Sequence, residues 1–315
     1  MVLRPKRDPD GYTHMTDITR QSTIQNNTIT ARIRAFLDLI RFEHTVFALP
    51  FAYIGMVLAA GGLPSFHQFF WVTVAMAAAR TTAFAINRLA DRRYDATNPR
   101  TAMRPSVSGT ISPRTMAFFA GLSLAILALA AALLNPLTLI LFPGALIFLV
   151  GYSYTKRFTV LCHWILGFTD ALAPMGGWIA VRGSVFSADD LPAWLLLFAV
   201  TTWIAGFDLI YACQDVEHDQ QEGLYSWPSR YSIASALRMS KLNHLLTVIL
   251  FALMGLVVPL GWPFWIALVI TAGLLTYENV IVKPDDLSRI NVAFFNINSY
   301  IAITLFVGTF LALII

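Results

Sequence analysis

The chain has 315 residues, of which 57% are hydrophobic and only 13% are charged, with a formal net charge of +4. This composition and a mean hydropathy of +0.64 exclude an ordinary soluble domain. They predict an all-α protein that crosses the lipid bilayer several times. The two cysteines, Cys162 and Cys213, lie in or beside apolar segments without metal-ligand spacing. They indicate neither a disulfide framework nor a zinc site.

Residues 1–43 form a polar and basic segment ahead of the first apolar run. We expect a cytoplasmic tail that is partly disordered, with a short amphipathic helix at 31–43 on the membrane surface. No apolar run follows the first basic residues, so a cleaved signal peptide is not expected.

Nine apolar segments follow this tail, and each is long enough to span a bilayer. They lie at roughly 44–62, 68–90, 115–134, 136–154, 163–182, 191–213, 243–260, 262–281 and 291–315. Asn135-Pro136 separates the third from the fourth, and Gly261-Trp262-Pro263 separates the seventh from the eighth. The sequence therefore predicts one transmembrane domain of nine helices at 44–315.

The distribution of basic residues predicts the orientation of these helices. With the N-terminus in the cytoplasm, all but two of the 22 Lys and Arg residues fall in cytoplasmic segments, as the positive-inside rule requires. The exceptions are Arg182, which falls outside, and Arg80, which lies within a span. Because topology accounts for the basic character of the chain, no nucleic-acid partner is predicted.

A polar cluster closes the second span on the predicted cytoplasmic side. Asn87, Asp91 and Asp95 recur every four residues, so they project from nearly one face of a helix. Their oxygens suit Mg²⁺, especially where phosphate oxygens complete its coordination. We expect this helix to end near Thr97, because the proline two residues later disfavours helix at the position before it. With arginines around it, the cluster predicts a metal–diphosphate site.

The sixth span ends in a second polar cluster with matching spacing. Its positions, separated by seven and then four residues, are Asp208, Asp215 and Asp219. Each lies 128 residues after a polar residue of the first half, namely Arg80, Asn87 and Asp91. The match indicates an internal duplication, with two four-helix halves, a ninth helix and a site between the halves. The loop Gln220–Arg230, marked by Gly223 and Pro228, is expected to cap that site.

These motifs resemble those of the UbiA-type membrane prenyltransferases. The first is Asn87-x3-Asp91-x3-Asp95 followed by Asn98-Pro-Arg-Thr-Ala-Met-Arg-Pro105, and the second is Tyr211-Ala-Cys-Gln-Asp215-x3-Asp219. Supporting segments are Phe42-Glu-His-Thr-Val-Phe-Ala-Leu-Pro50 and Tyr154-Thr-Lys-Arg-Phe158. The resemblance extends from Phe42 to the C-terminus and includes the nine-span plan.

The resemblance implies nine helices around a central cavity in which two acidic motifs hold Mg²⁺ on the diphosphate of a polyprenyl donor. The allylic C–O bond ionises, and an aromatic acceptor attacks the cation through a ring carbon. Basic residues suited to the diphosphate oxygens are Arg100, Arg104, Lys156 and Arg157. Aromatic faces suited to the allylic cation are those of Tyr152, Tyr211 and Phe84.

Arg80 and Asp208 match positions that contact the acceptor in the family members acting on 4-hydroxybenzoate. We expect Arg80 to bind the carboxylate of a hydroxylated aromatic acid and Asp208 to accept its phenolic hydrogen bond. By contrast, Glu222–Arg230 and Lys283–Arg289 look more like relatives that use 1,4-dihydroxy-6-naphthoate. The exact acceptor therefore stays open within quinone biosynthesis.

The buried charges of the predicted bundle are also compatible with two different roles. Arg80 could form a structural ion pair with Asp208 or Asp170, since an arginine within a span usually faces a partner or a cavity. A secondary transporter would also combine a duplicated helical bundle with buried charge. Against a transporter, both acidic motifs lie at the cytoplasmic end of their helices and not at the midplane.

Overall fold

The computed structural model describes the backbone of residues 42–315 and the side chains from residue 49 onward. The predicted tail at 1–43, with its surface helix, lies almost wholly outside this part. Within it, eight helices are long and apolar enough to cross a membrane, and Leu49–Ala60 is a shorter apolar helix. The all-α membrane fold is confirmed. The ninth span and the orientation of the bundle stay predictions.

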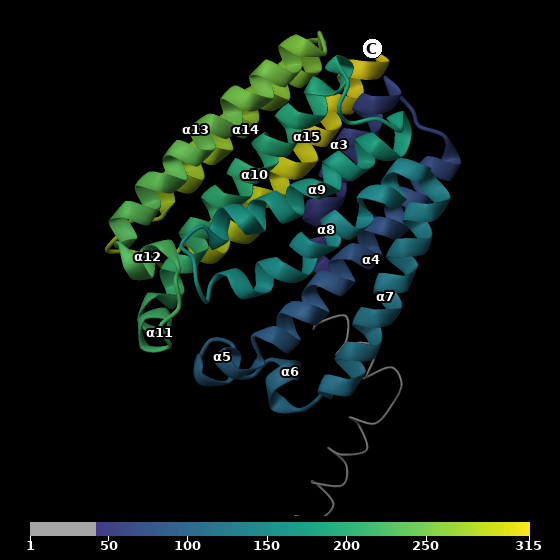
Figure 1. The fold of residues 1–315 in the computed structure, drawn as a ribbon. Coiled ribbons are helices and arrows are strands. Elements are labelled where there is room, and N and C mark those ends of the chain that lie inside the picture. Colours follow the sequence, from purple (N-terminus) through teal and green to yellow (C-terminus); the bar gives the residue numbers. More distant parts are fainter. Residues whose placement is uncertain (1–41) are drawn as a thin grey trace, which may run out of the picture.

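The long helices follow one another along the chain, and the two longest connections, at 91–112 and 213–232, contain short helices of their own. Those of the first half are α3 (Phe42–Ala60), α4 (Phe66–Ala90), α7 (Pro113–Leu134) and α8 (Pro136–Thr155). Those that follow are α9 (Cys162–Arg182), α10 (Leu191–Ala212), α13 (Ile233–Val257), α14 (Trp262–Ile281) and α15 (Asn298–Ile314). Four short helices gather at one end of the bundle (Figure 1): α5 (Arg92–Thr97), α6 (Pro105–Ser108), α11 (Val216–Gln221) and α12 (Trp227–Arg230).

Helix ends follow local sequence signals where the hydropathy pattern alone is ambiguous. Asn135 caps α8 by accepting the backbone N–H of Thr138, and Pro136 occupies the first turn, so one apolar run becomes two helices. The seventh predicted span begins ten residues too late, at 243. Ser232 caps α13, and its first turns carry exposed basic residues that a search for apolar segments misses.

The two helices that carry the acidic motifs change direction within those motifs. Helix α4 ends at Ala90, and α5 continues to Thr97, where we expected the helix to stop. Similarly, α10 ends at Ala212, and a 3-10 turn at Cys213–Asp215 leads into α11. A single helix through Asp95 was therefore an oversimplification.

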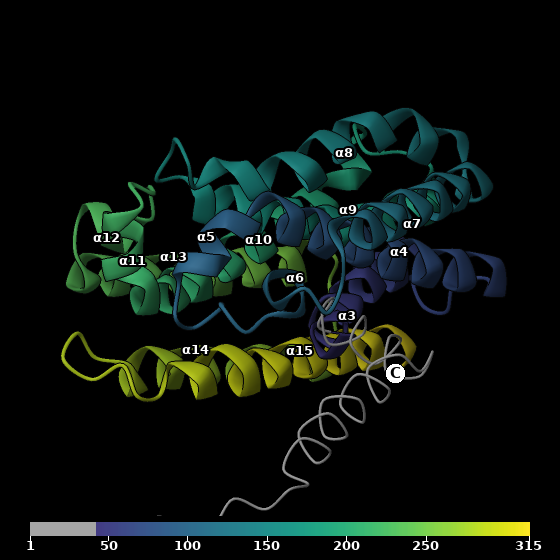
Figure 2. The same ribbon diagram turned by 90° about the horizontal axis from the view of Figure 1, so that it is seen from below.

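The first helices of the two halves, α3 and α9, pack closely together. A Cβ atom on Gly55 would overlap the backbone of Pro174, and one on Gly177 would overlap the backbone of Ala52. Small residues of this kind allow close helix approach in membrane proteins. In Figure 2, α14 and α15 form a neighbouring pair along one side of the bundle, and α15 also contacts α3.

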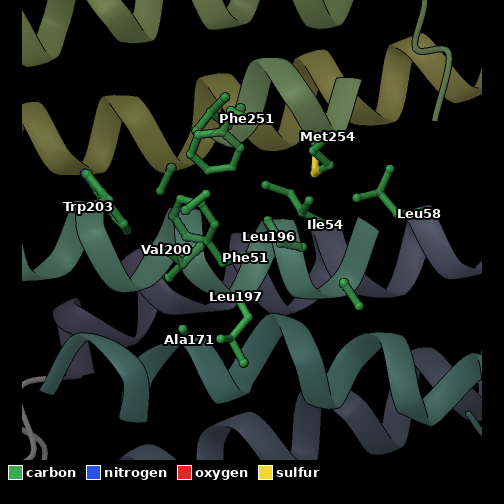
Figure 3. Close-up of a cluster of buried hydrophobic side chains, with 14 of the residues drawn as sticks. Phe51, Ile54, Leu58, Ala171, Leu196, Leu197, Val200, Trp203, Phe251 and Met254 are labelled. Carbon is green, nitrogen blue, oxygen red and sulfur yellow. The ribbon is translucent and has the colours of Figure 1, made fainter. Parts of the chain in front are cut away.

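The buried core lies where α3, α9, α10 and α13 meet (Figure 3). Phe51 of α3 contacts the Trp203 ring at a centroid distance of 4.6 Å, and Phe251 and Met254 of α13 are almost completely buried. A hydrogen bond of 2.9 Å joins Trp203 Nε1 to Asn298 Oδ1, which fixes α15 against α10. The exterior is apolar, with Ile140 and Ile147 of α8 each 71% exposed, as a lipid-facing surface requires.

The α3–α9 contact gives a test of the fold with a matched control in the next residue. Gly177→Ala should destabilise the protein by about 1–3 kcal/mol, because its Cβ has no space beside the α3 backbone. Gly176→Ala should not destabilise the protein and should gain up to about 1 kcal/mol, the usual advantage of Ala over Gly within a helix, since nothing lies within 4 Å of its Cβ position. Thermal unfolding of both variants in detergent measures the difference. Equal stabilities would contradict the close packing described here.

Candidate active site

The two acidic motifs lie at the end of the bundle where the short helices α5, α6, α11 and α12 gather (Figure 1). Asp91 has φ −93° and ψ 3°, and Asp215 has φ −106° and ψ 10°. Both angles fall in the sparsely populated bridge region, which active-site residues often occupy. Each motif thus has one aspartate in this conformation, although the 128-residue offset pairs Asp215 with Asn87 and Asp219 with Asp91.

In the first motif, Asn87 and Asp91 lie together as predicted. Asn87 Nδ2 donates to Asp91 Oδ2 at 2.8 Å. The other carboxylate oxygen, Oδ1, lies 3.5 Å from Arg157, whose guanidinium also donates to the carbonyl of Ala90 at 2.7 Å. Arg157 stacks over the ring of Tyr154 at 4.7 Å. The loop after α8 therefore supplies a cation to the end of α4.

Asp95 is buried and lies between two arginines. Arg104 approaches Oδ1 at 2.6 Å, and Arg88 lies 3.8 Å from Oδ2. Among the described residues, Oδ2 has no hydrogen-bond partner although it is inaccessible to solvent. A buried carboxylate oxygen with spare lone pairs is suited to a cation.

Asp215 of the second motif is bound by residues of the first half. Arg100 makes a two-pronged contact, with Nε 3.1 Å from Oδ1 and Nη2 2.6 Å from Oδ2. Asn98 Nδ2 donates to Oδ1 at 2.9 Å. The fork of Arg100 matches the two oxygens of the carboxylate, a geometry that strengthens an ion pair. Neither contact follows from the spacing of the motif.

Asp219 is completely buried, and its two oxygens have different partners. Lys156 approaches Oδ1 at 2.8 Å, and the Ser226 hydroxyl donates to Oδ2 at 2.5 Å. Lys156 comes from the α8–α9 connection, whereas Ser226 precedes α12. The predicted capping loop is thus held directly on the second motif. In contrast, Glu217 is exposed.

The predicted metal-binding and diphosphate-binding residues thus form a group of ion pairs that includes both halves of the chain. We call this group the ion-pair network. Four carboxylates are matched by five basic side chains. The excess of one positive charge favours an anionic ligand. The pKa of Asp91 is raised by burial and then by the charge of Asp95. Burial lowers the pKa of Lys156, but the contact with Asp219 more than compensates, so its pKa is raised.

The residues fit Mg²⁺ in chemistry, although they are not gathered around one point. The described part of the chain holds no group of three or more His, Cys, Asp or Glu side chains arranged to bind a metal. Each carboxylate contacts a cation instead. All the predicted ligands offer hard oxygen donors, and the buried Oδ2 of Asp95 is available to such an ion. A metal at this site would replace arginine and lysine partners.

A cavity of about 270 Å³ extends from this network into the bundle. Its lining includes Asn87, Arg88 and Arg104 from the network and both Arg80 and Asp208. Its aromatic lining residues are Phe51, Phe84, Tyr152, Trp203, Phe207, Tyr211 and Phe294. The predicted cavity between the halves is therefore present, polar at one end and aromatic along its walls.

All three predicted aromatic residues line this cavity, and the hydroxyls of the two tyrosines are hydrogen-bonded. Tyr152 donates to the carbonyl of Ala83 at 3.3 Å. The Tyr211 hydroxyl accepts from Arg100 Nη1 at 2.9 Å, and its ring lies 4.1 Å from that of Phe294. Tyr211 thus connects the ion-pair network to the aromatic wall.

Arg80 and Asp208 do not pair with each other. Arg80 contacts Asp170 of α9 at 3.2 Å, and its guanidinium lies 5.0 Å over the ring of Phe84. Asp208 instead contacts the Nδ1 atom of His163 at 2.6 Å. Of the pairings considered for Arg80, the one with Asp170 is correct and the one with Asp208 is wrong. His163 was missed, although a polar residue beside an apolar span is a signal for such a role.

A second cavity, of about 370 Å³ and almost wholly apolar, adjoins the first between α4, α7, α8 and α9. Arg80, Ala83 and Asp170 line both cavities. The Arg80–Asp170 ion pair therefore lies at the boundary between the first cavity, with its polar end and aromatic walls, and the apolar second cavity.

Comparison with known proteins decides the class. A model described as the UbiA prenyltransferase family matches residues 48–300. The chain belongs to this family. A relative from Saccharophagus degradans named 4-hydroxybenzoate octaprenyltransferase is 27% identical over 295 residues, which cover 92% of this chain and 96% of that protein.

Solved structures of other UbiA homologues share the fold. The apo structure of a homologue from Aeropyrum pernix K1 has a TM-score of 0.77 and 32% identity, covering 84% of this chain and 96% of the other. A homologue from Archaeoglobus fulgidus bound to DMAPP and Mg²⁺ has a TM-score of 0.63 and 21% identity, covering 86% and 98%. This UbiA chain is thus a membrane prenyltransferase, and the transporter alternative is not supported.

Proposed function

We propose that this UbiA-family enzyme uses Mg²⁺ to transfer a polyprenyl group from polyprenyl diphosphate to a ring carbon of a hydroxylated aromatic acid, in ubiquinone or menaquinone biosynthesis. The proposal rests on one observation: two different parts of the site lie next to each other. A network of carboxylates and basic side chains adjoins an aromatic cavity that is lined by one further arginine and two further aspartates. The first part suits a metal-bound diphosphate, and the second suits an aromatic acid.

The basic side chains of the network would bind the donor diphosphate. Arg100, Arg104, Lys156 and Arg157 already contact carboxylate oxygens, and phosphate oxygens offer them equivalent charge-assisted bonds. Residues with oxygen donors for the metal are Asn87, Asp91, Asp95, Asp215 and Asp219. Bound Mg²⁺ would neutralise the charge of the departing diphosphate. The donor thereby takes over partners that the free protein pairs internally.

The chemistry then breaks the allylic C–O bond and one ring C–H bond and forms one C–C bond. The allylic C–O bond breaks, and its electron pair leaves with the diphosphate. A ring carbon of the acceptor bonds to the allylic carbon, and the ring then loses its proton. Tyr152 and Tyr211, with the other aromatic walls of the cavity, can stabilise the cation through their ring faces. The apolar second cavity offers space for the prenyl chain.

Arg80 and Asp208 would orient the acceptor in the cavity. Arg80 offers a guanidinium for the carboxylate of the acid, and Asp170 fixes its position. Asp208 would accept the phenolic hydrogen bond, which makes the ring richer in electrons and more reactive. The relatives' name supports 4-hydroxybenzoate as the acid. The segments Glu222–Arg230 and Lys283–Arg289 support 1,4-dihydroxy-6-naphthoate instead, and a competition assay with both acids separates them.

The first prediction tests the carboxylates. Asp91→Ala and Asp215→Ala should each nearly abolish prenyl transfer, because each removes an oxygen ligand and its charge from the metal–diphosphate site. Asp→Asn changes should be almost as damaging, whereas the Glu217→Gln control should cost little. Product formation by purified, folded protein is the measurement. Turnover near wild type in either Ala variant would refute the assignment.

The second prediction concerns Arg80. Arg80→Ala should raise the acceptor KM strongly while changing the donor KM little, because only the acceptor loses a charged contact. An acceptor analogue that lacks the carboxylate should discriminate far less between wild type and variant. Asp170→Asn is the matched change on the other side of the ion pair. If both variants lose as much activity with the analogue as with the acid, Arg80 serves only the ion pair.

The third prediction concerns orientation. We expect the protein to lie in the inner membrane of a bacterial cell with its site on the cytoplasmic side. Ser65 and Ser108 are exposed near opposite ends of the bundle, since the 25 residues of α4 span about 37 Å. In intact cells an impermeant thiol reagent should label Ser65→Cys and leave Ser108→Cys unlabelled. The native cysteines are buried and give little background. The reverse pattern would place the site on the outer face.

A further inference from the structure

His163 occupies the second position of α9, and only 2% of its surface is exposed. Its Nδ1 atom lies 2.6 Å from Asp208 Oδ2. Its Nε2 atom accepts the backbone N–H of Trp227 at 3.1 Å. Both ring nitrogens therefore make a hydrogen bond, Nδ1 with an aspartate that lines the cavity and Nε2 with the backbone at the start of α12.

These partners assign the proton of the imidazole. Because Nε2 faces an N–H donor, it must be unprotonated, so the proton resides on Nδ1 and is donated to Asp208. A protonated imidazole would place two N–H groups against each other at Trp227. The neutral ring orients Asp208 without cancelling its negative charge. Asp208 therefore remains a hydrogen-bond acceptor beside the cavity that it lines.

The segment that holds Nε2 is itself attached to the ion-pair network. Ser226, immediately before Trp227, donates to Asp219, and the Tyr225 N–H donates to the carbonyl of Lys156 at 2.7 Å. Asp219 and Lys156 also pair with each other. One continuous set of contacts thus leads from the network through the start of α12 and His163 to Asp208.

We propose that His163 is a positioning residue that holds Asp208 in place for the acceptor. It also fixes the position of Asp208 relative to the diphosphate end of the site. The inference deepens the proposed function and rests on it. The Nδ1–H bond restricts rotation of the Asp208 carboxylate, and the Nε2 contact fixes the ring that makes this bond. A carboxylate held in this way meets the phenolic hydroxyl without the cost of being ordered on binding.

Three substitutions at position 163 separate positioning from simple packing. His163→Asn retains a side-chain N–H close to the place of Nδ1 and can still donate to Asp208. His163→Gln carries its amide further out, near the place of Nε2, and His163→Leu keeps bulk without any donor. Each variant is assayed as purified full-length protein with Mg²⁺, polyprenyl diphosphate and either 4-hydroxybenzoate or 1,4-dihydroxy-6-naphthoate.

We expect His163→Leu to lower kcat/KM for the acceptor about 10- to 100-fold, the usual effect of losing a hydrogen bond to a charged group. The donor KM should stay within about twofold of wild type, within the usual scatter between variants. His163→Asn should recover most of the loss, and His163→Gln should recover less. In an Asp208→Asn background, His163→Leu should cost no more than about threefold, because the two side chains act as one unit.

Several outcomes would overturn the inference. An unchanged acceptor kcat/KM in His163→Leu, equal behaviour of the Asn and Gln variants, or an undiminished loss in the Asp208→Asn background would each show that the histidine only packs. If His163→Leu does not fold, the comparison of Asn with Gln decides. If the wild-type protein prenylates neither acid, the proposed function and the role of His163 both fail. If wild type is active and His163→Leu matches it, only the role of His163 fails.

Discussion

The pairing of buried carboxylates with cations from distant segments is the constraint on which this structure depends. Asp95, Asp215 and Asp219 are each less than 10% exposed, and an unpaired charge in such surroundings is very costly. Each is neutralised by Arg88 and Arg104, by Arg100, or by Lys156. These pairs bring the connections after α4, α8 and α10 together at one end of the bundle.

In the proposed function, the same pairs would exchange ligands when the donor binds. Asp215 in the second half is bound by Arg100 from the first half, and Asp219 is bound by Lys156 from the connection between the halves. A metal-bound diphosphate offers a cation to the carboxylates and oxygens to the basic residues, so it can replace the internal pairs without leaving charges unmatched. Under the proposed function, binding of the donor would be coupled to the arrangement of the two halves for this reason.

Much of the architecture could be predicted from the sequence because membrane helices and metal-binding carboxylates leave strong local patterns. Apolar runs and their proline and asparagine breaks gave the helix order, and the 128-residue offset gave two matched motifs. The partners of those motifs depend on which side chains meet in space. Thus Arg100 with Asp215, Arg80 with Asp170 and His163 with Asp208 could not be read from spacing, and neither could the polar start of α13.

Binding of geranyl diphosphate to the purified protein, measured by calorimetry with and without Mg²⁺, tests the exchange most directly. We expect wild type to bind this donor analogue only when Mg²⁺ is present, and Asp91→Ala and Asp215→Ala to lose the Mg²⁺-dependent binding while remaining folded. Binding of equal strength without Mg²⁺, or in folded variants that lack either carboxylate, would contradict the claim that these carboxylates exchange their cationic partners for a metal-bound diphosphate.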